Sequence, residues 1–104
     1  MALITLEEAK EYLRVDTADE DTMIGILLTS AKRLCADVAR LSDDQWVSIN
    51  TDEEDAALAP LRETMRVAIL YALGYLFEHR EEADHHELIL TLRSLLFAIR
   101  EGVV

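Results

Sequence analysis

Three histidines and two glutamates lie close together late in the chain and are the residue types that bind zinc or iron. They are His79, Glu82, His85, His86 and Glu87. Their spacing matches neither a His-Glu-x-x-His helix motif nor the paired Glu-x-x-His motifs of a di-iron bundle. The group also falls in a charged stretch between two apolar segments. We therefore expect a solvated connection here, and predict no metal and no other cofactor.

The residue types needed for nucleophilic catalysis do not form a working arrangement either. No serine lies in a Gly-x-Ser-x-Gly elbow, and Cys35 has no histidine near it in sequence. The three glycines, Gly25, Gly74 and Gly102, are too scattered to form a phosphate-binding loop. Carboxylates are plentiful, but on a hydrated surface they keep ordinary proton affinities. The sequence therefore predicts that this protein is not an enzyme.

Length and charge restrict the remaining functions. The 104 residues suit one domain, 1–104, around one core. A formal net charge of −11 opposes nonspecific binding to nucleic acid or anionic membranes, and no basic stripe is evident in the sequence. The apolar runs are far shorter than the roughly 20 residues that span a bilayer, and the first residues do not resemble a signal peptide. Apolar neighbours of Cys35 indicate a buried thiol, which suits a reducing cytoplasm.

Helix-forming residues dominate and helix breakers are few, so we predict an all-α fold of about four helices. The first begins at Thr5, because Glu8 completes a capping-box spacing. Acidic residues 19–21 mark the start of a long second helix. Pro60 suits the first turn of a third helix that runs to about His79, and a fourth follows the histidine-rich connection.

Apolar residues in the last three helices recur at spacings of three and four, which predicts core-facing stripes. In the second helix the stripe is Ile24, Leu27, Leu28, Ala31, Leu34, Cys35, Val38 and Leu41. In the third it is Leu61, Met65, Ile69, Ala72, Leu73 and Leu76. In the fourth it is Leu88, Ile89, Leu92, Leu95, Leu96, Ile99 and Val103.

The third helix is also apolar on the side away from its core stripe. The residues there are Val67, Leu70, Tyr71 and Gly74. A core of this size has no room for a second layer beyond that helix, and glycine costs a helix about 1 kcal/mol relative to alanine unless another group approaches closely. We therefore predict that these four residues contact another subunit.

Residues 42–59 break the helical periodicity and predict a long, strongly negative connection. Its acidic residues are Asp43, Asp44, Asp52, Glu53, Glu54 and Asp55. Trp46, Val47 and Ile49 interrupt the charge and are expected to anchor the connection to the core. A short helical turn capped by Thr51 is a further expectation.

The order of these elements resembles the small head-tail connector proteins of tailed phages and prophages, also called head-completion or DNA-packaging proteins. The resemblance lies in four segments, LITLEEAKEYLRVD, DEDTMIGILLTSAKRLCADVA, PLRETMRVAILYALGYLFEHREE and LRSLLFAIREG. In this family the third helix ends in an aromatic-Glu-x-Arg-Glu pattern, and a late Leu-Leu-x-x-aromatic-Arg follows. The matching residues here are Phe77, Glu78, Arg80, Glu81, Leu95, Leu96 and Arg100, with Ile99 in the second aromatic position.

The resemblance implies a structural role at the virion neck after assembly in the host cytoplasm. It implies a ring of copies of this chain below the portal protein, onto which a stopper or tail-completion protein docks. DNA would pass through without specific binding, and no membrane is involved. An acidic lumen suits such a conduit, because carboxylates repel the phosphate backbone. Two other hypotheses are a small acidic regulatory or DNA-mimic module that binds other proteins, and a helical metalloenzyme built on the histidines.

Overall fold

The computed structural model describes residues 3–51, 59–79, 81 and 85–97, and these contain five helices and no strand. The helices are α1 (Leu6–Leu13), α2 (Asp21–Ala39), α3 (Asp43–Thr51), α4 (Ala59–Glu78) and α5 (His86–Leu95). The predicted all-α fold is thus confirmed, with one helix more than the four expected.

The predicted start of α1 is confirmed in detail. The backbone N–H of Glu8 donates to Thr5 Oγ1 at 3.1 Å, and the N–H of Thr5 donates to Glu8 Oε1 at 3.2 Å. This reciprocal capping box satisfies two backbone donors that a helix start leaves free. Helix α2 begins at Asp21, within the acidic segment that predicted it, and Asp21 forms an ion pair of 2.7 Å with Lys10 of α1.

The additional helix corrects the prediction for residues 42–59, because α3 occupies Asp43–Thr51. Its start is a second capping box, in which the N–H of Gln45 donates to Ser42 Oγ and the N–H of Ser42 donates to Gln45 Oε1. Ile49 is buried and Trp46 packs against the core as expected, whereas Val47 is exposed. The turn expected to start at Thr51 falls mainly on residues 52–58, outside the described part of the chain.

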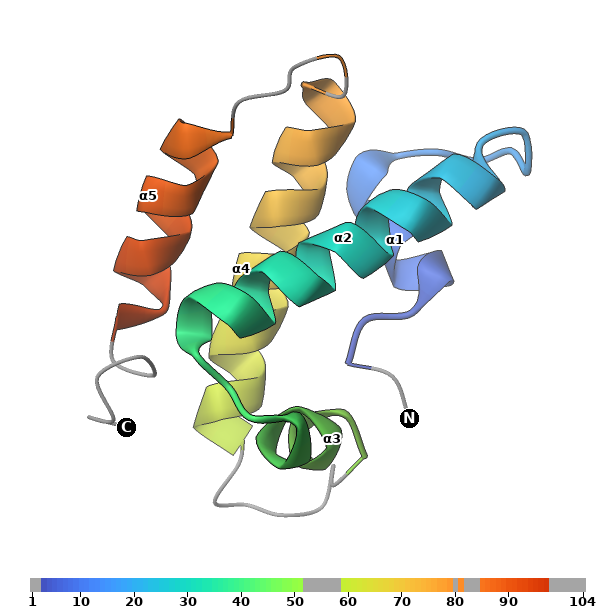
Figure 1. Cartoon of the computed structure of the whole chain (residues 1–104). Coiled ribbons are helices and arrows are strands. Elements are labelled where there is room, and N and C mark those ends of the chain that lie inside the picture. The colour runs from blue at the N-terminus through green and yellow to red at the C-terminus, as the bar shows by residue number, and fades with distance from the viewer. Residues whose placement is uncertain (1–2, 52–58, 80, 82–84, 98–104) are drawn as a thin grey trace.

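Helices α2 and α4 cross and make the most extensive helix packing, with α1 and α5 on either side of them and each in contact with both (Figure 1). Helix α3 lies below this group, near the start of α4 (Figure 1). The buried core is entirely apolar among the described residues. It comprises Leu3, Ile4, Ala9, Ile24, Leu28, Ala31, Cys35, Ala39, Ile49, Met65, Ala68, Ile69, Ala72, Leu73, Leu76, Leu88, Leu92 and Leu96.

The buried side of each helix agrees with its predicted stripe, apart from small shifts around the helix axis. In α2 the buried line includes Ala39, while Leu27, Leu34, Val38 and Leu41 pack at its edge. In α4 Ala68 joins the stripe and Leu61 is half-buried. In α5 the buried line is Leu88, Leu92 and Leu96, while Leu95 is exposed. Ile99 and Val103 lie outside the described residues.

Burial of Cys35 is also as predicted. The residue has no exposed surface, and its thiol is surrounded by apolar side chains of the core. Burial disfavours the thiolate and raises the pKa of Cys35 to about 12. The thiol is therefore neutral and shielded at physiological pH.

Candidate interaction surface

The outward side of α4 is where the sequence predicted a subunit contact, and two of the four predicted residues are strongly exposed there. Val67 is 58% exposed and Tyr71 is 40% exposed. Leu70 is half-buried and packs against the core of its own chain, and Gly74 lies under a side chain from α1. Exposed apolar side chains remain in water unless a partner covers them, so Val67 and Tyr71 are the candidates for contact.

The group that approaches Gly74 is Tyr12, a residue that the sequence analysis did not single out. A Cβ atom placed on Gly74 would lie 3.1 Å from Tyr12 Cε2 and 3.5 Å from the phenolic oxygen. Tyr12 is itself 49% exposed. Tyr12, Val67 and Tyr71 are hereafter called the α4 surface. A signal for Tyr12 was present in the sequence, because this aromatic residue lies off the apolar side of α1 that Ala9 and Leu13 define.

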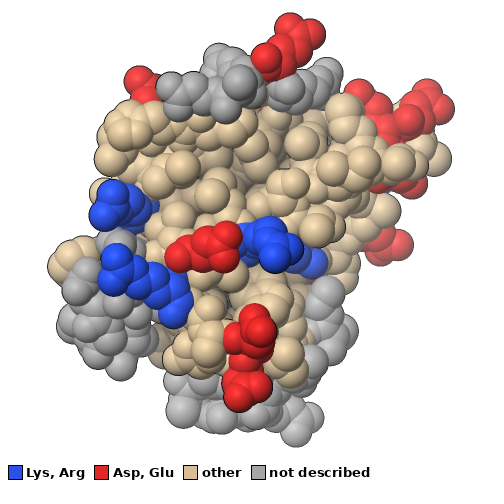
Figure 2. All heavy atoms as spheres, in the orientation of Figure 1, with Lys and Arg blue, Asp and Glu red and all other residues tan. Residues whose placement is uncertain are grey.

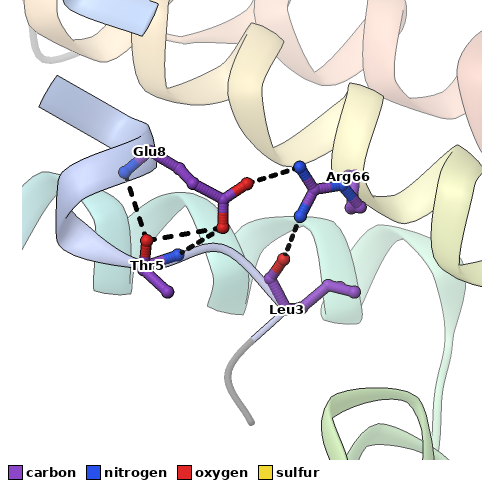
Figure 3. A network of polar contacts seen from close by, with 4 residues as sticks. All are labelled: Leu3, Thr5, Glu8 and Arg66. Carbon is purple, nitrogen blue, oxygen red and sulfur yellow. Dashed lines mark hydrogen bonds and ion pairs between the residues drawn. The ribbon is translucent and has the colours of Figure 1, made fainter. Parts of the chain in front are cut away.

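The exposed charges on α4 itself are acidic because the arginines of α4 have partners within the chain. Arg66 donates from Nη1 to the carbonyl oxygen of Leu3 at 2.5 Å, and its Nη2 lies 2.5 Å from Glu8 Oε2 (Figure 3). Arg62 donates to the carbonyl oxygen of Ile49. The exposed charged residues on the described part of α4 are therefore Glu63 and Glu78.

The contact between Arg66 and Glu8 changes the proton affinity of both groups. The hydrogen bond from Arg66 lowers the pKa of Glu8, and this outweighs desolvation, which acts in the opposite direction. The same hydrogen bond raises the pKa of Arg66. Both groups are therefore charged at neutral pH. Because Arg66 also holds Leu3, one side chain joins α4 to α1 and to the segment before α1 (Figure 3).

The acidic residues predicted to line a lumen are only partly placed. Asp43 and Asp44 are exposed in the first turn of α3, where negative charge interacts favourably with the helix dipole. Residues 52–55, which supply the other four acids, lie outside the described part of the chain.

The residues carrying the family motifs are split between core and surface. Phe77 packs against the core and Leu96 is buried. Glu78, Glu81 and Leu95 are exposed. Arg80 and Arg100 lie outside the described residues.

The histidines form aromatic contacts. The ring of His79 stacks on Tyr75 with centroids 4.2 Å apart, and His85 meets the same ring edge-on at 6.0 Å. Tyr75 thus joins the end of α4 to the start of α5. Glu82 lies outside the described residues, and the described ones contain no group of histidine, cysteine and carboxylate side chains able to hold a metal ion.

A helical chain with an exposed apolar surface is typical of proteins that assemble, and comparison with known families agrees. The family model described as phage gp6-like head-tail connector protein matches residues 3–99. The chain therefore belongs to this family of structural phage proteins. No curated protein and no solved structure matches it significantly. In the part of the chain that the structure describes, no helix combines the length and hydropathy needed to cross a bilayer.

Proposed function

We propose that this chain forms a ring of identical subunits at the virion neck, below the portal protein, through which DNA passes toward the tail. The observation that carries the proposal is the exposure of Val67 and Tyr71 on a helix whose other side fills the core. In a ring each subunit uses one surface to contact a different surface of the next copy. The α4 surface supplies one half of such a contact, and family membership supports the location.

The partners follow from this position. The portal protein lies on one side of the ring, and a stopper or tail-completion protein docks on the other. The subunits meet these partners in the host cytoplasm, where virions assemble. The acidic lumen consists of Asp43, Asp44, Asp52, Glu53, Glu54 and Asp55. A net charge of −11 supports passage of DNA without retention, because like charges repel at each phosphate.

The oligomeric state of purified protein tests the ring. Native mass measurement over a range of concentrations should show a closed oligomer of fixed size. Tyr71→Glu should disperse it, because a carboxylate would be buried in every contact, and circular dichroism should still show a helical monomer. Ser94→Glu, which adds the same charge at an exposed position of α5, serves as the control and should leave the oligomer intact.

Other results would contradict the proposal. A monomer or small dimer at all concentrations would favour the acidic regulatory module instead. Normal assembly of the Tyr71→Glu variant would show that the α4 surface is not a subunit contact. Tight, salt-sensitive retention of duplex DNA in a gel-shift assay would contradict the conduit, since such binding requires phosphate contacts.

A further inference from the structure

The solvent-facing side of α2 carries a second set of exposed residues, with the opposite charge. Ile26 is 62% exposed, Arg33 and Asp37 are exposed further along the helix, and Arg40, the left-handed residue that ends it, is exposed as well. Spacings of seven and four residues place Ile26, Arg33 and Asp37 on one side of α2. These four residues are hereafter called the α2 surface.

Basic side chains gather on this side of the molecule although the chain is acidic. Figure 2, which views the molecule from the α2 side, shows lysine and arginine atoms in a row across the face, interrupted by acidic atoms. Arg93 of α5 is exposed as well, and Lys32 is half-buried beside Arg33. Burial lowers the pKa of Lys32, while the charge of Glu8 opposes that effect. The basic row that the sequence did not reveal is thus assembled by the fold.

The α2 and α4 surfaces point in opposite directions, because the two helices pack against each other through their buried sides. This placement suits a ring. In a ring of many subunits the rotation between successive copies is small, so the two contacting surfaces of one subunit lie on nearly opposite sides.

We propose that the α2 surface of one subunit binds the α4 surface of the next. The inference rests on the proposed ring and specifies its subunit contact. Both surfaces have an exposed apolar centre, Ile26 on one and Val67 with Tyr71 on the other. Their charges are complementary, since Arg33 and Arg40 would face the acidic border of the α4 surface.

A second copy suits the α2 surface better than DNA does. The exposed Ile26 contributes nothing to phosphate binding but can be buried in a protein contact. Asp37 lies between the two arginines and would repel a phosphate backbone. The acidic remainder of the chain also opposes DNA, whereas the α4 surface offers apolar area and Glu63 and Glu78 at its border offer carboxylates.

Cross-linking between two chains that each carry one introduced cysteine tests this contact. Ile26→Cys and Val67→Cys chains are co-expressed, one with a size tag, and treated with a short flexible bismaleimide. The native Cys35 contributes little background because it is buried and its pKa is raised to about 12. A linked pair of the two different chains is expected, and neither variant alone should link. Leu90→Cys, on the exposed side of α5, replaces Ile26→Cys in the control and should not link to Val67→Cys.

Charge exchange gives an independent measurement. Arg33→Glu with Arg40→Glu should disperse the ring, as should Glu63→Lys with Glu78→Lys. All four changes in one chain should restore it, because the charges are again complementary. Native mass measurement distinguishes these states.

Five results would overturn the inference. A Val67→Cys dimer without the other variant would mean that two α4 surfaces face each other. Linkage to Leu90→Cys instead would make α5 the partner. A ring that forms without linkage between Ile26→Cys and Val67→Cys would refute this contact but leave the proposed function standing, whereas absence of any oligomer would refute both. Duplex DNA binding that is lost on Arg33→Glu with Arg40→Glu would identify the α2 surface as a nucleic-acid site.

Discussion

Arg66 of α4 and Glu8 of α1 lie 58 residues apart in sequence, and their Nη2 and Oε2 atoms are 2.5 Å apart. The same guanidinium holds the carbonyl oxygen of Leu3 at 2.5 Å, while the N–H of Leu3 donates to Asn50 of α3 at 3.2 Å. Hydrogen bonds therefore link the segment before α1 to both α3 and α4. This arrangement keeps α1 against α4 and so keeps Tyr12 over Gly74.

Replacing Arg66 with methionine should lower the free energy of unfolding by about 1 to 2 kcal/mol, because a partly buried carbonyl and a carboxylate each lose a donor. Lysine at this position keeps the charge but cannot form both bonds with one planar group. The stability of Arg66→Lys should therefore lie between that of the original protein and that of Arg66→Met. Urea unfolding at neutral pH measures the difference. A methionine variant as stable as the original protein would show that this contact contributes nothing net.

The pH dependence of stability should show the lowered pKa of Glu8. A carboxyl group whose pKa is lower in the folded state stabilises the fold above its unfolded pKa, here near the ordinary value of 4.5, and loses that contribution as pH falls through the folded value. As the pH falls from neutral into the acid range, the free energy of unfolding of Glu8→Gln should therefore decrease less steeply than that of the original protein. Glu7→Gln, at the exposed neighbouring residue, is the matched control and should retain the original slope.

Gly74→Ala should reveal the contact with Tyr12. Alanine gains about 1 kcal/mol over glycine inside a helix, but its Cβ would require the Tyr12 ring, now 3.1 Å away, to shift by a few tenths of an ångström. The half-exposed ring has room to move, so we expect a net gain smaller than the full amount. In a Tyr12→Ala background the same change should give the full gain. Equal effects in both backgrounds would contradict the contact, since a double-mutant cycle measures only their interaction.

Arg14→Gly should raise the melting temperature. Arg14 ends α1 in the left-handed region, with φ of 60°, which costs a non-glycine residue roughly 1 kcal/mol or more. Glycine adopts this conformation without that cost, so a gain of up to about 1 kcal/mol is expected, or several degrees for a domain of this size. Arg14→Ala retains the strained conformation and is the control. An equal gain in stability in both variants would show that the effect comes from the lost charge and not from the backbone conformation.

Much of the fold follows from signals that act within a few residues. The capping box of Thr5 with Glu8, the position of Pro60 in the first turn of α4, and the apolar period of α2 and α4 predicted the helices and most of the core. Helix α3 was within reach of the same reasoning, since Ser42 and Gln45 have capping-box spacing. Its acidic composition led us to a connection instead, although acids in a first turn favour a helix.

Only the tertiary structure decided the character of the surfaces. Sequence periodicity placed Val67 and Tyr71 on the outward side of α4, but not the pairing of Arg66 with Glu8 and Leu3, which leaves that side acidic. Nor does it place Tyr12 over Gly74 or gather the basic side chains into the row that Figure 2 shows. These contacts join residues far apart in sequence, so they depend on the angles at which helices cross. Those angles are set by how whole side-chain surfaces fit together, which no short window of sequence contains.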